Sequence, residues 1–349
     1  MIEIGKGNLL EANVEALINT VNCVGVMGKG IALQFKQAFP DNFHAYKKVC
    51  DAGMMKLGEV LVVHTGRREN PIYIINFPTK YHWKGKSYIP DIELGLQSLV
   101  KQVQLLGIES IAVPPLGCGN GGLDWKDVRP LIEAAVAELP NVRVLLFEPG
   151  SAPQADTMPV RTKPPRMNRT RALVVSLLSR YRKVGYKSSL LEVQKLLYFL
   201  QTAGEPLNLQ YVASKYGPYA EKVNFILQNM EGHFIKGYGD RSSPSGISVV
   251  PEAIEEASAL LANAADAEER LERVSKLIDG FETPYSMELL ATVHWVAQED
   301  TQAAIDVNAA IAKVRGWSQR KNDLFTPEHI REAWEWLQEE QWLPAGTIS

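Results

Sequence analysis

The sequence is poor in cysteine, in long apolar runs and in net charge. Its three cysteines, Cys23, Cys50 and Cys118, cannot all pair and lack the spacing of metal ligands, which favours reduced thiols. No apolar run approaches the roughly 18 residues of a membrane span, and the opening MIEIGKGNLL lacks the apolar core of a signal peptide. We therefore expect a cytoplasmic protein without membrane contact.

A net charge of -3 excludes a general attraction to nucleic acid, so any such binding needs a local patch. No cluster of histidine, cysteine and carboxylate residues suggests a metal site, and we expect chemistry without metal or cofactor. A length of 349 residues with 46% apolar and 22% charged residues predicts two ordinary globular domains.

Residues 1–148 alternate between short runs rich in valine and isoleucine and helical patterns. The expected strands are VEALINTV, EVLVVHT, IYIINF, SIAVPP and VRVLLF. Helical patterns follow Asp91, which can cap a helix that Gly107 ends, and Asp124. This half is thus expected to form a three-layer α/β/α domain with a mixed sheet, whose strand-to-helix loops are the default ligand site.

Residues 149–169 read as a linker, because five prolines fall between Pro149 and Pro165. No aspartate or glutamate occurs from Thr157 to Leu191, whereas arginine and lysine recur. This basic run fits either a nucleic-acid or acidic partner surface, or an ordinary solvated face.

Residues 170–349 are mainly helical. Ser189 and Glu192 have the spacing of a capping box, and Thr326 is a candidate cap. The amphipathic pattern of residues 251–280 predicts one long helix or two shorter ones. Trp334 and Trp336 lie about 200° apart around a helix, so either one of them serves a second interface or the helix packs on two sides.

Two glycine-rich loops each follow a strand and precede a helix, namely VNCVGVMGKGIALQF and PPLGCGNGG. The first is not a P-loop, because Gly30 stands where Ser or Thr must follow the lysine, and its glycine spacing does not fit a dinucleotide fingerprint. Two such loops at adjacent strand ends can clamp a diphosphate with backbone amides and a helix N-terminus.

Together with Gly7-Asn8 and INTVN, these loops resemble the macrodomain, an ADP-ribose-binding α/β/α module. The resemblance covers residues 1–148. It implies that the first loop contacts the distal ribose, the second the diphosphate, and Asn8 the adenine, with Phe147 either stacking on adenine or lying in the core. The implied ADP-ribose-binding residues are Asn8, Leu9, Asn19, Asn22, Gly28, Lys29, Gly30, Ile31, Ala32, Thr79, Leu116, Gly117, Cys118, Gly119, Asn120 and Gly121.

Within macrodomains, INFPTKYHWKGKSY resembles the branch that holds the terminal ADP-ribose protein glycohydrolase and the DarG-type antitoxins. Thr79-Lys80 matches the position of the catalytic lysine in that branch. The human-type enzyme also uses an aspartate, and that alignment falls on Gly121, which favours the DarG-like subgroup. Residues 190–204 and 213–227 resemble the helical antitoxin domain sometimes called Panacea.

The resemblance implies a metal-independent hydrolase that removes ADP-ribose from thymidine in single-stranded DNA. It also implies a DarT-type toxin as partner, bound through residues 170–349. Lys80 is expected to act either as a cation at the departing base or as a nucleophilic amine. Trp83, Lys84 and Lys86 interleave an aromatic ring with cations and are candidate DNA contacts, or they belong to a loop anchored by its own aromatics. A reader of ADP-ribose and a protein or ester ADP-ribose hydrolase are the alternatives.

Overall fold

The computed structural model describes residues 1–150, 158–181, 186–239 and 246–343. They divide into two compact units, one holding Met1–Pro164 and the other beginning at Pro165. Of the expected linker, residues 158–168 form neither helix nor strand. Met158 packs against the core of the first unit, and the amide of Arg161 donates to the carbonyl of Gln37. This end of the linker is therefore anchored on the first unit.

The first unit is built around one six-stranded sheet with the strand order β1-β6-β5-β2-β4-β3. Only β3 runs antiparallel to its neighbour, so the sheet is mixed, as the sequence predicts. In chain order its elements are β1 (Ile2–Ile4), the 3-10 helix η1 (Leu9–Glu11), β2 (Ala16–Asn22), α1 (Gly30–Ala38), α2 (Pro40–Asp51), β3 (Leu61–His64), β4 (Tyr73–Lys80), α3 (Ile89–Leu106), β5 (Ser110–Val113), α4 (Trp125–Ala137) and β6 (Arg143–Leu146).

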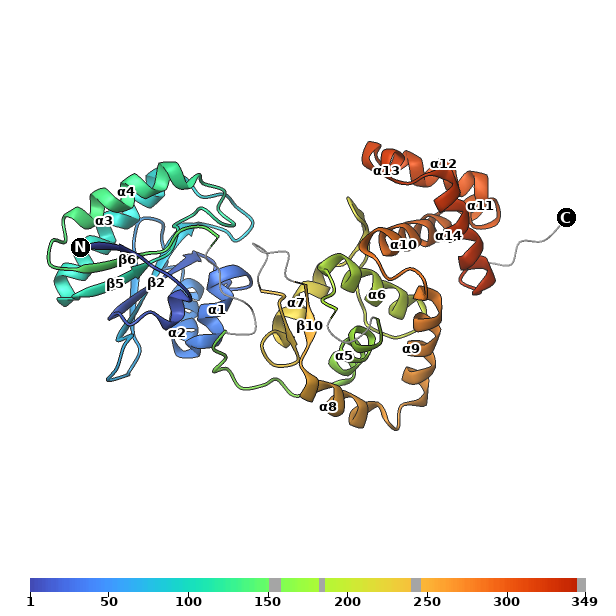
Figure 1. The fold of residues 1–349 in the computed structure, drawn as a ribbon, viewed down its shortest axis with the longest axis horizontal. Coiled ribbons are helices and arrows are strands. Elements are labelled where there is room, and N and C mark those ends of the chain that lie inside the picture. The colour runs from blue at the N-terminus through green and yellow to red at the C-terminus, as the bar shows by residue number, and fades with distance from the viewer. Residues whose placement is uncertain (151–157, 182–185, 240–245, 344–349) are drawn as a thin grey trace. The chain divides into compact units, whose positions relative to one another are not determined.

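Helices cover both faces of this sheet (Figure 1). Successive side chains of a strand point to opposite faces, and β2 shows the consequence. Ile18 packs in the core beneath α3 and α4, whereas Leu17 packs with Phe35 of α1. The strand is buried on both faces, which explains why its sequence is almost continuously apolar.

The strands of the first unit lie where the sequence predicts them, except that β1 is not predicted. It has only three residues, of which two are exposed, so no apolar pattern marks it. Asp124 caps α4 and Gly107 ends α3 in the left-handed conformation, as expected. The expectation for Asp91 is wrong: α3 begins at Ile89, because Pro90 fits the first turn of a helix, and Asp91 lies inside that turn.

The described part of the second unit is mainly helical and also contains four short strands that the sequence does not predict. Its elements are α5 (Arg169–Tyr181), α6 (Leu190–Thr202), β7 (Val212–Ser214), β8 (Gly217–Tyr219), α7 (Glu221–Met230), β9 (Ile235–Lys236), β10 (Ser248–Val249), α8 (Pro251–Leu261), α9 (Ala265–Ile278), α10 (Pro284–Glu299), α11 (Thr301–Ile305), α12 (Val307–Gly316), α13 (Gln319–Leu324) and α14 (Pro327–Glu339).

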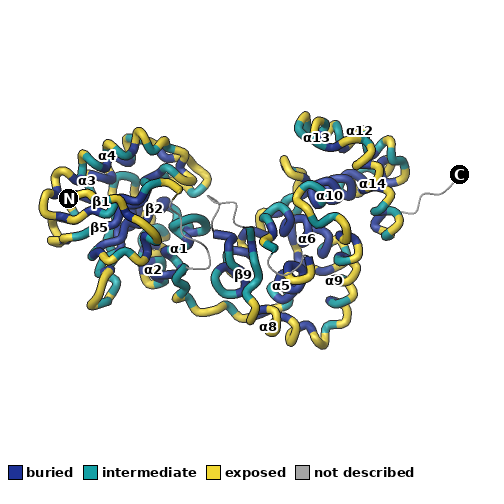
Figure 2. The backbone as a smooth tube through the Cα atoms, in the orientation of Figure 1, coloured by how far each residue is buried: buried dark blue, intermediate teal, exposed yellow. Residues whose placement is uncertain are grey.

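The central helices of this unit, α6 and α10, are mostly buried (Figure 2). Ser189 and Glu192 form the expected capping box at α6, and Thr326 caps α14. Helix α14 packs on two sides. The indole of Trp334 donates to the carbonyl of Ala303, while that of Trp336 donates to Leu277 and its ring stacks on Phe281. A second interface is therefore not needed to explain the pair.

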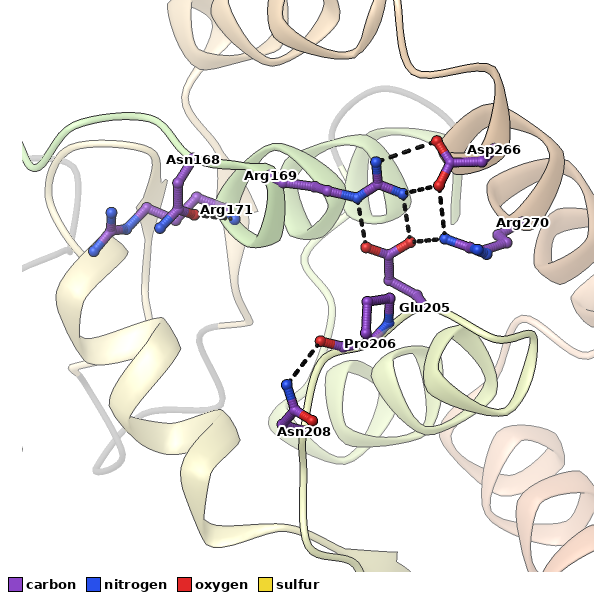
Figure 3. Close-up of polar contacts among 8 residues, drawn as sticks. All are labelled: Asn168, Arg169, Arg171, Glu205, Pro206, Asn208, Asp266 and Arg270. Atoms are coloured by element: carbon purple, nitrogen blue, oxygen red, sulfur yellow. Dashed lines mark hydrogen bonds and ion pairs between the residues drawn. The ribbon is translucent and has the colours of Figure 1, made fainter.

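Part of the basic run forms ion pairs within the second unit. Arg169 at the start of α5 forms ion pairs with Glu205 and Asp266, and Arg270 contacts the same two carboxylates (Figure 3). Glu205 is only 2% exposed, so the two guanidinium groups compensate a buried charge. At least one arginine of the basic run, Arg169, thus helps to hold α5 against α9.

None of the helices in the described part of the chain is long and apolar enough to cross a membrane.

Candidate functional site

A cavity of about 630 Å³ lies in the first unit, where the parallel strands β2, β4, β5 and β6 end. This is the edge at which open α/β sheets bind ligands, and the volume is in the usual range of ligand pockets, about 300–1,000 Å³. Both glycine-rich loops contribute to its lining, together with the start of η1 and the residues after β6.

The first glycine loop leads from β2 into α1, which begins at Gly30. Gly30 has a φ of +55°, a conformation that favours glycine, and the Lys29 side chain does not cap the first turn. The first turn of a helix leaves amide N–H groups without intrahelical acceptors, and Ile31 and Ala32 of this turn line the cavity. The helix start therefore offers a site for an anionic group.

Asn22, at the end of β2, holds the first loop in shape. Its Oδ1 accepts from the amides of Val24 and Val26 and from the hydroxyl of Tyr46, and its Nδ2 donates to the carbonyl of Val26. Asn22 also lines the cavity. A side chain with both donor and acceptor is needed for this pattern, which gives a physical reason for an asparagine here.

The second glycine loop leads from β5 into α4 and meets the first loop across the cavity. Because β5 is the neighbour of β2 in the sheet, the two loops start side by side. A Cβ built on Gly30 would lie 3.5 Å from Nδ2 of Asn120, so the side chain of Asn120 reaches toward the first loop. The expected pair of facing glycine loops is present.

Lys80 ends β4, and its side chain spans from that strand to the second loop. Its Nζ donates to the carbonyl of Asn120 at 2.9 Å and to that of Gly85 at 3.4 Å. No carboxylate forms an ion pair with Lys80 among the described residues. Burial lowers the pKa of Lys80 from its ordinary 10.5. Lys80 is thus a half-buried cation whose side-chain partners are neutral carbonyls.

Gly121 has no room for a side chain. A Cβ at this position would lie 2.2 Å from Oγ of Ser87 and 2.3 Å from the carbonyl oxygen of Gly117. The amide of Ser87 also donates to the carbonyl of Gly121, so the second loop is held against residues 81–88, which we call the lip. An aspartate at position 121 would require the backbone to move.

The cysteines near the site are poor nucleophiles. Burial raises the pKa of Cys118, which lines the cavity, and that of Cys23 to about 11. A thiol reacts as its thiolate, which is scarce at neutral pH when the pKa is this high. Among the described residues no three His, Cys, Asp or Glu side chains are placed to hold a metal ion.

Comparison with known proteins identifies the family. Residues 18–132 match the Macro domain family. A DNA ADP-ribosyl glycohydrolase of Thermus aquaticus is 46% identical over 334 residues, which span 95% of this chain and 92% of that protein. The chain belongs to the DNA ADP-ribosyl glycohydrolase family.

Two further relatives match a part of the chain. The macrodomain of Mycobacterium tuberculosis DarG is 52% identical, covering 43% of this chain and 99% of its own, with a TM-score of 0.43. A DNA ADP-ribosyl transferase-DNA ADP-ribosyl glycohydrolase fusion protein of Thermosipho africanus is 34% identical over 146 residues, which are 38% of either chain.

In this glycohydrolase family member, most of the residues that the resemblance names line one cavity. They are Asn8, Leu9, Asn22, Gly28, Lys29, Gly30, Ile31, Ala32, Thr79, Lys80, Gly117, Cys118, Gly119, Asn120 and Gly121. Asn19 and Leu116 do not line it. Asn19 is buried and donates to Oδ1 of Asn76, and Leu116 lies in the core beneath α3 and α4. Both support the strands and loops from behind.

One end of the cavity, which the resemblance assigns to adenine, is formed by η1 and the residues after β6. Oδ1 of Asn8 caps η1 by accepting from the amide of Leu10. Phe147 is 3% exposed and belongs to the core, although it also reaches the cavity. Glu148 lines this end and pairs with Arg129 of α4.

Sequence reasoning missed part of the lining: Gly7, Leu10, Thr20, Val21, Val26, Gln34, Pro114, Pro115, Glu148, Pro149 and Gly150. The residues after β6 had a usable signal, because β6 is another parallel strand and its carboxyl end must meet the same edge.

The lip connects Lys80 to α3 and presents the candidate DNA contacts. Trp83 lines the cavity, its ring lies beside His82, and Nζ of Lys84 lies 4.8 Å from the centre of the indole. Lys84 and Lys86 are exposed, as is Tyr81, whose side chain makes no ring contact in the described part of the chain. The lip is therefore only partly held by its own aromatics.

Proposed function

We propose that this chain removes ADP-ribose from thymidine in single-stranded DNA, with Lys80 as the catalytic residue, and that residues 170–349 bind a DarT-type toxin. The observation that carries the proposal is the placement of Lys80. This lysine lines the cavity and joins the end of β4 to the second glycine loop through its hydrogen bond to the carbonyl of Asn120. The family of the chain supports the DNA substrate, and the lip supports a strand bound beside the cavity.

The cavity suits ADP-ribose by its chemistry. The diphosphate would lie between the two glycine loops, where the amides at the start of α1 and the backbone of Gly117–Gly121 offer neutral donors. The adenine would lie toward Asn8 and the residues after β6. The distal ribose would then reach the carboxyl end of β4, which brings its base-linked carbon to Lys80.

Lys80 is suited to act as the cation that assists the departing base. Cleavage moves the electron pair of the N-glycosidic bond onto the thymine ring nitrogen and leaves an oxocarbenium ion on the sugar. The Lys80 ammonium donates a proton to that nitrogen, and water adds to the sugar carbon and loses a proton. Two carbonyl acceptors favour the ammonium form, since both hydrogen bonds would weaken if the amine became a nucleophile.

The same cation cannot be supported by an aspartate of the human type, because position 121 admits no side chain. A thymine anion spreads its charge over two carbonyl groups and needs less assistance than a poorer leaving group. The Lys80 cation together with a preorganised clamp is enough in principle for such a substrate. We propose that the reaction takes place in the cytoplasm.

The helical unit is the proposed toxin-binding part. The fusion protein from Thermosipho africanus joins a DNA ADP-ribosyl transferase to a DNA ADP-ribosyl glycohydrolase in one chain, which supports a functional link between the two activities. A purified, inactive DarT-type toxin should bind the full chain and not a chain that ends at Pro164. Binding by the truncated chain, shown folded by its retained ADP-ribose affinity, would remove the helical unit from this role.

The glycohydrolase is tested by single-turnover release of ADP-ribose from an oligonucleotide that carries ADP-ribosyl-thymidine. Lys80→Ala should lower the rate at least about 100-fold while free ADP-ribose still binds. The matched control is Lys48→Ala, because Lys48 is an exposed lysine on α2. A glutamate-linked ADP-ribosyl peptide is assayed in parallel. Release from the peptide alone would reject DNA as substrate, and tight binding without release would indicate a reader.

A further inference from the structure

A second cavity, of about 400 Å³, lies directly beyond the ends of β2 and β4. It is lined by Cys23, Val24, Cys50, Gly53, Met55, Lys56, Leu57 and Tyr81. Asn22 and Lys80 line the main cavity, and the next residue of each strand, Cys23 and Tyr81, lines the second. The amide of Cys23 donates to the carbonyl of Tyr81 at 2.8 Å, so one pair of backbone segments separates the two cavities.

The lining of the second cavity combines apolar side chains with one exposed ring and one cation. Met55 is buried and Leu57 half-buried, and both cysteines are thiols because burial raises their pKa. Tyr81 is 65% exposed and contacts no other aromatic ring among the described residues. Lys56 is exposed and forms no ion pair in that part of the chain. Such a surface fits a flat aromatic group attached to an anion.

We propose that this second cavity binds the nucleotide next to the modified thymidine, with its base stacked on Tyr81 and its phosphate near Lys56. The inference rests on the proposed function, because it takes a DNA strand to leave the main cavity at Lys80. Along an extended chain successive side chains point to opposite sides, and here Lys80 serves the first cavity while Tyr81 serves the second. A DNA strand that runs across the carboxyl ends of β2 and β4 therefore brings adjacent bases to adjacent cavities.

The chemistry of the lining favours a base of the DNA strand over a second ADP-ribose. The second cavity has a single lysine and no glycine-rich loop at a helix start, so it lacks the clamp that a diphosphate requires. One cation near one exposed ring matches one phosphate and one base. Unpaired bases stack on aromatic side chains irrespective of sequence, so the cavity contributes affinity for single strands.

The test compares two substrates, ADP-ribosyl-thymidine alone and an oligonucleotide that carries it in the middle. Tyr81→Ala should raise KM for the oligonucleotide about tenfold, a loss within the range for one stacked base, and leave the single nucleoside unaffected. Tyr81→Phe keeps the ring and should behave as the wild type. Oligonucleotides with an abasic site 5′ or 3′ of the modified thymidine identify the neighbour, since removal of the bound base should abolish the effect of Tyr81→Ala.

Lys56→Gln should weaken oligonucleotide binding and reduce its salt dependence, whereas Lys48→Gln on α2 should change neither. Equal KM values for wild type and Tyr81→Ala on the oligonucleotide would overturn the proposal. So would a Tyr81→Ala penalty that persists on both abasic substrates. Failure of the proposed function is separate, because it would show as no release of ADP-ribose by the wild type from either substrate.

Discussion

The Nζ of Lys80 lies 2.9 Å from the main-chain carbonyl oxygen of Asn120, which joins the end of β4 to the second glycine loop. The amide of Ser87 in turn holds the lip to Gly121 of the same loop. Strand, loop and lip therefore fix the position of the cation together. A ligand that moves the loop or the lip must also move Lys80.

The pH dependence of ADP-ribose release should report the protonation of Lys80. Burial lowers its pKa from 10.5, so the ammonium is lost at lower pH than from an exposed lysine. We expect the single-turnover rate to fall as pH rises through this lowered pKa. Lys80→Arg should show a slower and pH-independent rate, because arginine does not deprotonate. A wild-type rate that rises with pH would instead indicate the neutral amine as nucleophile.

Gly121→Ala should destabilise the first unit and slow release. The added Cβ would overlap Oγ of Ser87 and the carbonyl oxygen of Gly117. Overpacking of this kind costs about 1–3 kcal/mol, and it displaces the loop that holds the Lys80 ammonium. Thermal unfolding measures the effect. Gly119→Ala in the same loop is the matched control for stability, since a Cβ there meets no atom within 4 Å. Equal melting temperatures for both variants would show that the loop adapts.

The lip should contribute both stacking and charge to DNA binding. In a Lys80→Ala background, which retains the substrate, Trp83→Ala should weaken binding of the modified oligonucleotide by about 1–3 kcal/mol. Lys84→Gln and Lys86→Gln should each lower the slope of log affinity against log salt by about 0.7, while Lys48→Gln leaves it unchanged. If Trp83→Ala binds the modified oligonucleotide with unaltered affinity, Trp83 does not stack on DNA and only anchors the lip.

Much of the first unit could be predicted because its strands and helices carry strong local signals. The continuous apolar runs mark β2 and β4, and Asp124 marks the start of α4. The signal fails where burial is one-sided or the element is short, as in β1 and in β7–β10 of the second unit. Such strands are fixed by their partners in the sheet, which a single sequence does not reveal.

The site was predictable to the extent that backbone requirements leave a mark on the sequence. The glycines and the asparagine at the end of β2 are visible because few residues meet their conformational or hydrogen-bonding demands. Asn19 shows the limit. It lies in the same motif as Asn22, yet its side chain faces Asn76 in the interior, because the direction of a side chain depends on the register of the sheet.

Glu205 should be a stability determinant of the helical unit. Its buried carboxylate accepts from Arg169 and Arg270, and the guanidinium of Arg169 holds its pKa below the ordinary value of 4.5 (Figure 3). Glu205→Gln should lower the unfolding free energy by about 2 kcal/mol. Asp266→Asn, in the same cluster but 53% exposed, should cost clearly less, because water screens an exposed ion pair. The stabilisation by Glu205 is present above its ordinary pKa and is lost as pH falls through its lowered pKa. Indistinguishable losses in the two variants would contradict the role of burial.

Lys195 should make the stability of the chain rise with pH. It is 2% exposed, its Nζ donates to the carbonyl of Pro218, and burial with the nearby charge of Lys321 lowers its pKa to about 7. Between that value and 10.5 the unfolded chain holds a proton that the folded chain has released, so unfolding becomes less favourable as pH increases. The slope contributed by one such group is at most about 1.4 kcal/mol per pH unit. Lys195→Met keeps the length of the side chain and removes the titration. The difference in unfolding free energy between wild type and Lys195→Met, measured by urea denaturation at neutral and alkaline pH, should therefore change in favour of the wild type as pH rises. If the difference in unfolding free energy between the two proteins is the same at every pH, Lys195 titrates alike in the folded and unfolded chain. Its contribution would then be limited to the hydrogen bond with the carbonyl of Pro218.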